Sequence, residues 1–316
     1  MTLAAAVKRR ADELGFLACG ITDPSPVPDG DRLDLWLASG YAGVMRYLHR
    51  QARKRKDPRL IIPGAKSVVV VLDNYYNGDA RPGPAPRVAR YARSKDYHRV
   101  TRERLEPLAE LLRSHGATVA HSFADSGPVP ERALGLRAGL GWIGKNTMLI
   151  RPGAGSFFFI GTLFTDLALD RDDAEVTDHC GSCTRCLDAC PTEALVEPRV
   201  LYATRCISYL TIEQKGPIPP ALADRLEGWV FGCDICNEVC PWNQRFAEAS
   251  RAEEYRPAEP LAGAGPDLFE RMDEAEFNRR FGDTPLERAG LQGMRRNFRA
   301  ALARDPEGAR RDPERR

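Results

Sequence analysis

Eight of the nine cysteines in this chain fall into a pattern with two runs that each end in Cys-Pro. The first run is Cys180-x2-Cys183-x2-Cys186-x3-Cys190-Pro191. The second is Cys233-x2-Cys236-x3-Cys240-Pro241, with Cys206 upstream. Thiolates at this spacing hold [4Fe–4S] clusters, and in two-cluster ferredoxins the fourth cysteine of a run binds the other run's cluster. The spacing therefore predicts two clusters that transfer single electrons. Their ligands would be Cys180, Cys183, Cys186 and Cys240 for one, and Cys190, Cys206, Cys233 and Cys236 for the other.

Zinc and disulfide bonds are the alternatives for these cysteines. Zinc sites usually pair C-x2-C units across a longer spacer and often include histidine. Disulfides need an oxidising compartment, but residues 1–20 lack the long apolar stretch and cleavage site of a signal peptide. The pattern thus favours iron–sulfur clusters and a cytoplasmic protein. Cys19 stands alone in an apolar context, which favours a buried structural thiol.

Charge is unevenly distributed along the 316 residues. The segment 41–104 carries 16 Lys or Arg and 5 Asp or Glu, a net charge of +11, whereas the rest of the chain carries −9. A basic block of this kind indicates a polyanionic partner such as nucleic acid, or else a solvated helix face. No apolar run reaches 18 residues, so no membrane span is expected.

Hydrophobic periodicity and turn residues predict an α+β fold. Helices are expected at 2–14, 33–53, 96–114 and 130–139, and strands at 67–72, 117–123 and 156–165. A Pro/Gly-rich loop is expected at 78–87. The predicted units are 1–170, a cysteine-rich ferredoxin-like domain at 171–246, and a helical segment at 247–316 with a charged, disordered end.

Several further segments stand in a distinctive order. They are Asp57-Pro-Arg-Leu-Ile-Ile-Pro-Gly-Ala-Lys-Ser-Val, Tyr91-Ala-Arg-x-x-Asp-Tyr-His, Asp125-Ser-Gly-Pro-Val-Pro-Glu-Arg-Ala, Ala138-Gly-Leu-Gly-Trp-Ile-Gly-Lys-Asn-Thr, the cysteine runs, and Cys206-Ile-Ser-Tyr-Leu-Thr-Ile-Glu. In this order they closely resemble the epoxyqueuosine reductase family. The resemblance covers nearly the whole chain.

The resemblance implies an oxidoreductase that reduces epoxyqueuosine to queuosine at position 34 of tRNA, the last step of queuosine biosynthesis. It implies base-off cobalamin in a nitroreductase-like catalytic domain at 1–170. Electrons would pass through the two [4Fe–4S] clusters from a donor such as a flavodoxin or ferredoxin. It also implies a monomer. Many members carry C-terminal helical repeats that contact tRNA, and this chain is expected to lack them. Asp96-Tyr97-His98 begins like the Asp-x-His-x-x-Gly signature of His-on cobalamin proteins, but residue 101 is Thr, so no axial histidine is assigned.

The resemblance also places the proton donor on Asp125. A positioned general acid contributes about 10²–10⁴-fold to such a reaction. A carboxylic acid donates at neutral pH only where burial favours its neutral form, and a stacked corrin face with apolar walls is expected to bury Asp125. The alternative is a turn or helix-cap carboxylate. Cobalamin contacts are expected at Asp125, Trp142, Gly144, Lys145, Asn146, Thr147 and Ser156, although the glycine-rich part could simply be a tight connection.

The tRNA contacts implied by the resemblance lie beside Cys206 and in the basic block. Ser208 and Tyr209 are expected near the anticodon, where an aromatic ring can stack on a splayed base. A Tyr209 packed into the core is the alternative. Candidate phosphate contacts are Arg90, Arg93, Lys95 and Arg99. Two competing functions remain open: a corrinoid reductive dehalogenase, and a non-catalytic iron–sulfur electron-transfer protein.

Overall fold

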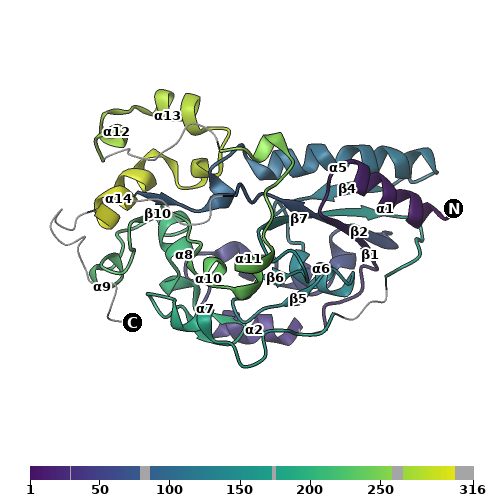
Figure 1. Cartoon of the computed structure of the whole chain (residues 1–316), viewed down its shortest axis with the longest axis horizontal. Coiled ribbons are helices and arrows are strands. Elements are labelled where there is room, and N and C mark those ends of the chain that lie inside the picture. Colours follow the sequence, from purple (N-terminus) through teal and green to yellow (C-terminus); the bar gives the residue numbers. More distant parts are fainter. Residues whose placement is uncertain (29, 79–85, 173–175, 258–265, 303–316) are drawn as a thin grey trace.

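The N-terminal half of the protein is built on a four-stranded antiparallel sheet with helices on both faces (Figure 1). The computed structural model describes residues 1–28, 30–78, 86–172, 176–257 and 266–302. The sheet order is β1-β2-β7-β4. These strands are β1 Ala18–Thr22, β2 Ser67–Asn74, β7 Phe158–Thr165 and β4 Ala120–Phe123.

Alternating side chains of β2 supply both cores of this half. Val69 and Val71 pack with helices α1 Leu3–Glu13 and α5 Tyr97–Ser114. Val68, Val70 and Leu72 face the other way, toward helix α6 Glu131–Arg137 and the hairpin of β5 Trp142–Ile143 and β6 Leu149–Ile150. Because successive residues of a strand point to opposite faces, a continuous run of valines fits a strand that is covered on both sides.

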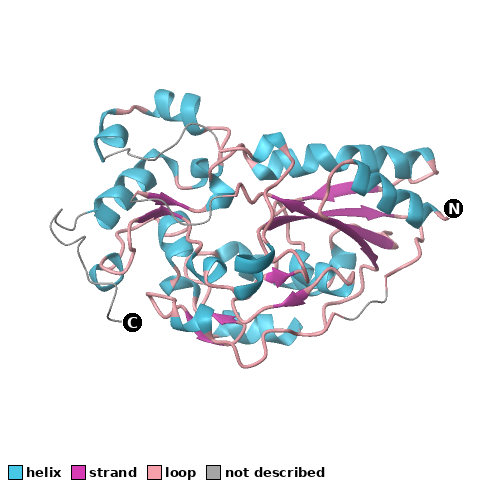
Figure 2. Ribbon diagram, in the orientation of Figure 1, coloured by secondary structure: helices cyan, strands magenta, loops and turns pink. Residues whose placement is uncertain are grey.

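The second half consists of short helices and two-stranded sheets (Figure 2). Strand β3 Arg87–Val88 pairs in parallel with β10 Trp229–Phe231, and β8 Leu195–Glu197 pairs with β9 Val200–Leu201. The helices between β1 and β2 in the chain are α2 Gly30–Ala38, α3 Arg46–Arg50, α4 Ala52–Lys56 and η1 Pro58–Leu60. The remaining helices follow β3: η2 Arg90–Ala92, α7 Arg185–Asp188, η3 Ala203–Arg205, α8 Ile207–Ile212, α9 Pro220–Ala223, α10 Ile235–Glu238, α11 Pro241–Phe246, η4 Glu253–Tyr255, α12 Pro266–Arg271, α13 Glu274–Phe281, η5 Pro285–Arg288 and α14 Gly290–Leu302.

The chain segment 87–92 belongs to the core of this second half. Val88 and Ala92 pack with β10 and with the C-terminal helices α12, α13 and α14, and Ala89 packs against Trp229. The N-terminal half therefore contributes a strand to the C-terminal half. The predicted boundary near residue 170 stays a prediction.

Most of the expected elements are present, and the α+β fold is confirmed. The single helix expected at 33–53 is wrong, because the chain turns through left-handed glycines at Gly40 and Gly43 and forms α2, α3 and α4. The strand expected from residue 117 begins at Ala120, and β1 was not anticipated. Most of the expected 78–87 loop and the charged end lie outside the described residues. No helix in the described ranges has the length and apolar character needed to cross a bilayer.

A buried carboxylate joins β2, α5 and the segment that follows the cysteine-rich region. Asp73 is 1% exposed and accepts hydrogen bonds from the Tyr255 hydroxyl at 2.7 Å and from Arg104 Nε at 3.2 Å. Thr101 Oγ1 lies 2.7 Å from the same Tyr255 oxygen. Burial raises the pKa of Asp73, while the charge of Arg104 and the Tyr255 hydrogen bond oppose that rise. The network therefore stabilises the fold only while its partners are complete.

We expect Tyr255→Phe to lower the free energy of unfolding by about 1–3 kcal/mol, because a buried carboxylate oxygen loses a donor. Tyr41→Phe is the matched control. Tyr41 stacks on Tyr202 at a ring separation of 4.5 Å, and its truncation should change stability by less than about 0.5 kcal/mol. Denaturant unfolding of both variants measures the difference, and equal losses would contradict the role given to the Tyr255 hydroxyl.

Candidate active site and cluster-binding module

The thiols of the cysteine-rich region lie in two groups, and the first surrounds Cys186. Burial and then the nearby thiols of three other cysteines raise the pKa of Cys186 to about 11; the three are Cys180, Cys240 and Cys183. Burial also raises the pKa of Cys240, and Cys180 and Cys183 add to the rise. Thiolates repel one another only at close range in a protein. These four residues are one of the two ligand sets predicted from the spacing.

The second group surrounds Cys236. Its pKa lies well above the ordinary value, first through burial and then through Cys206 and Cys190. The pKa of Cys233 is raised by burial and then by Cys236 and Cys206. Cys186 of the first group also acts on Cys236, so the two groups are neighbours. Electrons can thus pass from one predicted cluster to the other within the module.

Helix starts hold two of these ligands. Cys206 is the residue before α8, and the nearby backbone groups of Tyr209 and Ser208 oppose the rise that burial causes in its pKa. Cys240 occupies the same position before α11, where the backbone groups of Asn243 and Trp242 have the same effect. Free amide N–H groups at a helix start stabilise a thiolate.

All nine cysteines are free thiols. No three His, Cys, Asp or Glu side chains of the described ranges come together tightly enough for a single metal ion. A [4Fe–4S] cluster is bound by four cysteine thiolates. The two sets of four therefore fit two clusters, whose assembly would release the protons of the ligand thiols.

The β5–β6 hairpin of the N-terminal half contacts the first ligand set. The Trp142 indole N–H donates to the Cys180 sulfur at 3.4 Å, and the ring packs edge-on against Trp242 at 5.0 Å. Lys145 Nζ donates to the carbonyl oxygens of Gly181 at 2.7 Å and Cys183 at 2.9 Å. Trp142 and Lys145, both expected to contact cobalamin, thus have polar partners around the predicted cluster.

Asn146 and Ser156, also expected at the cobalamin, join a buried amide network. Asn146 Nδ2 donates to Asn237 Oδ1 at 3.2 Å, and the backbone N–H of Ser156 donates to Asn243 Oδ1 at 2.6 Å. Asn243 Nδ2 returns hydrogen bonds to Ser156 Oγ at 2.9 Å and to the Asn237 carbonyl at 2.8 Å. A Cβ on Gly155 would lie 2.1 Å from Asn243 Oδ1, so only glycine allows this approach.

Gly144 and Thr147 shape the turn of the same hairpin. A Cβ on Gly144 would lie 2.4 Å from Ile150 Cδ1. Thr147 has φ of +70°, and its carbonyl accepts a hydrogen bond from Arg132 at 2.6 Å. The glycine-rich segment is therefore a tight connection, whether or not it also contacts a cofactor.

Asp125 lies in the loop between β4 and α6 and is held by two hydrogen bonds. The Tyr97 hydroxyl donates to Asp125 Oδ2 at 2.6 Å, and the Asp125 backbone N–H donates to Glu131 Oε1 at 2.6 Å. Its φ is +52° and its side chain is 67% exposed. No apolar wall covers the carboxylate in the chain by itself, so the expected burial of Asp125 under a corrin stays a prediction.

Charged and aromatic groups from other elements surround this loop. Burial and then the charge of Asp125 raise the pKa of Glu131 to about 8. Arg55 of α4 donates to the Gly127 carbonyl at 3.4 Å, and its buried Nε is one of the unpartnered polar atoms of the described residues. Burial raises the pKa of Tyr47, and the nearby charges that act on it include Glu213, Arg288, Asp125 and Arg55.

Three residues beside Asp125 belong to the sequence motifs, but the motifs predict no role for them: Tyr97, His98 and Glu131. His98 Nδ1 lies 2.7 Å from Asp96 Oδ1, and its Nε2 lies 3.8 Å from Asp125 Oδ2. Asp96 caps α5, so His98 sits in its first turn. The order of the motifs was the signal in the sequence that could have pointed to these residues. The fold is needed to show that residues 97–98 lie beside residue 125.

The candidate phosphate contacts fall into different environments. Arg90 is 3% exposed and forms ion pairs with Asp234 and Glu238, so its prediction as a phosphate contact is wrong. Arg99 is exposed but paired with Asp283 at 2.7 Å and Glu103 at 3.0 Å. Arg93 is half-buried, with Nε donating to the Val88 carbonyl at 2.8 Å. Lys95 is exposed.

Tyr209 lies in the core rather than at an RNA-binding surface. It is 6% exposed, and its hydroxyl accepts the backbone N–H of Val44 at 2.9 Å. A Cβ on Gly43 would lie 2.2 Å from that hydroxyl oxygen. The prediction that Tyr209 stacks on a base is therefore wrong, and the core-packing alternative is correct. Ser208 is half-buried beside Cys206.

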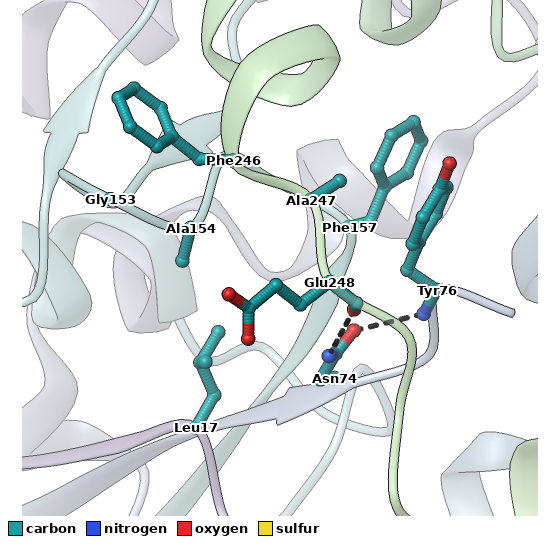
Figure 3. A pocket seen from close by; sticks show the side chains of 9 residues that line it. All are labelled: Leu17, Asn74, Tyr76, Gly153, Ala154, Phe157, Phe246, Ala247 and Glu248. Carbon is teal, nitrogen blue, oxygen red and sulfur yellow. Dashed lines mark hydrogen bonds between the residues drawn. The ribbon is translucent and has the colours of Figure 1, made fainter. Parts of the chain in front are cut away.

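A small pocket lies away from Asp125, between the end of β2 and the segment after α11 (Figure 3). Asn74 Nδ2 donates to the Glu248 carbonyl at 2.9 Å, and Asn74 Oδ1 accepts the Tyr76 backbone N–H at 2.9 Å. The other lining residues are Leu17, Gly153, Ala154, Phe157, Phe246 and Ala247. These contacts tie the exit of the cysteine-rich region to the sheet.

Comparison with known proteins places these features in one family. A family model described as a 4Fe–4S double cluster binding domain matches residues 179–243, which confirms the iron–sulfur prediction. A model described as epoxyqueuosine reductase QueG, DUF1730, matches residues 55–126. An epoxyqueuosine reductase of Cyclobacterium marinum is 41% identical over 297 residues, which cover 92% of this chain and 94% of that protein.

Two solved structures are also similar. An epoxyqueuosine reductase bound to an epoxyqueuosine-modified tRNA-Tyr stem loop gives a TM-score of 0.84 at 33% identity, covering 95% of this chain and 81% of that one. The Bacillus subtilis epoxyqueuosine reductase, with its catalytic aspartate loop swung out of the active site, gives 0.83 at 32% identity with the same coverage.

We expect Trp142→Phe to lower the midpoint potential of the cluster on Cys180, Cys183, Cys186 and Cys240. A hydrogen bond to a cluster sulfur favours the reduced state, so its loss makes reduction harder. At a fixed potential the ratio of reduced to oxidised cluster should fall about threefold to tenfold, where tenfold corresponds to about 59 mV for one electron. Electron paramagnetic resonance during a redox titration measures it.

Trp242→Phe is the matched control, because that ring packs on Trp142 without changing the Trp142 N–H. Equal shifts in both variants, or a shift confined to the other cluster, would contradict this role of Trp142.

Proposed function

Because this chain belongs to the epoxyqueuosine reductase family, we propose that it reduces epoxyqueuosine to queuosine at the wobble position of tRNA. The observation that carries the proposal is the presence of two four-thiol groups and an exposed, hydrogen-bonded Asp125 in one chain. A relative of the same fold binds an epoxyqueuosine-modified tRNA stem loop. The Bacillus subtilis relative has a catalytic loop that is named by an aspartate, and Asp125 also lies on a loop.

Conversion of an epoxide to an alkene consumes two electrons and two protons and releases one water. When bound, the two [4Fe–4S] clusters would supply single electrons and a base-off cobalamin would supply a reducible cobalt centre. Asp125 gives a proton to the epoxide oxygen as the C–O bond breaks. Tyr97 orients the Asp125 carboxylate, and Glu131 fixes the backbone of its loop.

The cobalamin part of the proposal rests on the family motifs and on the open side of Asp125. An exposed carboxylate and the unpartnered Nε of Arg55 leave polar atoms for a bound group beside the loop. Gly144 and Thr147 remain proposed contacts. The polar atoms of Trp142, Lys145, Asn146 and Ser156 are already hydrogen bonded, so these residues would contact the cofactor mainly by packing.

The proposal also covers the compartment, the oligomeric state, the electron donor and the tRNA contacts of the enzyme. We assign it to the cytoplasm as a monomer that receives electrons from a flavodoxin or ferredoxin. Free thiols at all nine cysteines support a reducing compartment. Ser208, beside the Cys206 ligand, and the cationic Arg93, Lys95 and Arg99 stay proposed tRNA contacts.

We expect Asp125→Asn to abolish conversion while clusters and cobalamin remain bound, because an amide cannot supply the proton. The assay is anaerobic turnover with reconstituted protein, cobalamin, a chemical reductant and tRNA that carries epoxyqueuosine. Mass spectrometry of the digested nucleosides detects the loss of one oxygen. Asp12→Asn, an exposed aspartate on α1, is the control and should keep full activity.

Full activity of Asp125→Asn would remove Asp125 as the proton donor. An unchanged nucleoside with the unmodified, fully loaded chain would reject the substrate itself. That result would favour a reductive dehalogenase or an electron carrier instead.

We expect Lys95→Gln to weaken tRNA binding at every sequence context and to reduce the slope of log affinity against log salt by about 1, as for one lost phosphate contact. Lys66→Gln, an exposed lysine before β2, should leave both quantities unchanged. Binding is measured across a salt series. A slope that is unchanged in Lys95→Gln, or changed equally in Lys66→Gln, would remove Lys95 from the tRNA surface.

A further inference from the structure

Asp96 and His98 have no role in the function as proposed above, yet the motif Asp96-Tyr97-His98 lies beside Asp125. Asp96 Oδ1 accepts the backbone N–H of His98 at 3.0 Å and lies 2.7 Å from His98 Nδ1. The Tyr97 and His98 rings stack with centroids 4.1 Å apart. This arrangement fixes the imidazole with Nδ1 on Asp96 and Nε2 on the side of Asp125, 3.8 Å from Oδ2.

The proposed reaction needs more protons than Asp125 holds. One carboxyl group carries one proton, whereas release of the epoxide oxygen as water takes two. The exposed side of Asp125 is where the substrate must approach, and a bound substrate keeps bulk water from that side. A second proton must then come from the protein side of the carboxylate.

Tyr97 and His98 contact or approach the Asp125 carboxylate from that side, whereas Glu131 accepts the backbone N–H of Asp125. Burial and then the charge of Asp125 hold the pKa of Tyr97 well above its usual value. The phenol therefore keeps its proton and serves as a fixed hydrogen-bond donor. Imidazole is the side chain whose proton exchanges most readily near neutral pH.

We propose that His98 reloads Asp125 during the reduction by transferring the proton on its Nε2 to the Asp125 carboxylate. The transfer turns an imidazolium into a neutral imidazole and a carboxylate into a carboxylic acid. The proton on Nδ1 stays on the hydrogen bond to Asp96, which sets the tautomer. His98 acts through Asp125 and is a positioning residue, not a direct donor to substrate. The inference rests on the proposed function, which supplies the substrate and the reductant.

The charges around His98 support its protonated form. Burial lowers the pKa of His98, but the hydrogen bond and charge of Asp96 and the charge of Asp125 outweigh burial, so its pKa lies above the usual value. Arg288 of η5 acts in the opposite direction. With a raised pKa the imidazolium persists to higher pH, and the reserve proton is lost as pH rises through that value.

The 3.8 Å separation is longer than a hydrogen bond, as is common for such pairs before substrate binds. Asp125 sits on a loop with a left-handed backbone, so a small rearrangement can shorten the distance. Asp96 and His98 stay fixed, because Asp96 is the cap of an 18-residue helix.

The test measures single-turnover rates of the fully loaded, pre-reduced enzyme with epoxyqueuosine tRNA from pH 5.5 to 9. We expect His98→Gln to lower the rate by about 10²-fold near neutral pH, at the low end of what a positioned proton donor contributes. The rate of the unmodified chain should fall on the alkaline side, and that fall should be absent in His98→Gln. Imidazole added to His98→Ala should restore the rate.

Asp96→Asn gives a second, milder variant, because Asn also caps a helix well. It removes the charge that raises the His98 pKa, so the alkaline fall should move to lower pH with His98 still present. His115→Gln, at the opposite end of α5, is the control and should keep the parental rate and profile.

The outcomes separate the two proposals. Turnover by the unmodified chain together with a parental rate and profile in His98→Gln would overturn the role of His98 and leave the proposed function intact. An unmoved alkaline fall in Asp96→Asn, or a His98→Ala variant that imidazole does not restore, would overturn it as well. No turnover by the unmodified chain would overturn both.

Discussion

The buried amide network of Asn146, Ser156, Asn237 and Asn243 is the interaction on which the arrangement of the site depends. It joins the β5–β6 hairpin and the start of β7 to the loops that carry Cys236 and Cys240. Each amide is buried, and the hydrogen bonds of Asn146 to Asn237 and of Ser156 to Asn243 cross between the halves. A buried polar group without a partner costs free energy. The network therefore favours the one relative placement of the halves in which its hydrogen bonds are made.

Two further contacts of cationic side chains act at the same junction. Lys145 holds carbonyl groups in the loop of Cys180 and Cys183. Arg90 is buried against Asp234, which lies between Cys233 and Cys236 in the chain. A cluster gains negative charge on reduction, so nearby cations and N–H donors favour that state. The N-terminal half thus both positions the module and influences its electron affinity.

The sequence predicted what depends on local pattern and spacing. The cysteine grouping follows from short spacings, and the valine run of β2 follows from its apolar, β-branched composition. It did not predict where long-range packing decides the outcome. Tyr209 and Arg90 looked available for RNA, but one fills the core under Gly43 and the other is buried against Asp234. The helix expected at 33–53 failed because its glycines take left-handed conformations that only the fold requires.

The Asp125 loop contrasts with the rigid junction. A non-glycine residue with φ of +52° is uncommon, and it persists where surrounding contacts fix it. Here Glu131 holds the backbone N–H and Tyr97 holds the carboxylate, while no apolar group covers the outer side. The same two contacts that hold this conformation therefore direct the carboxylate outward. A proton donor must face its substrate and still exchange protons with the protein. A loop whose contacts all lie on the protein side of the carboxylate meets both requirements.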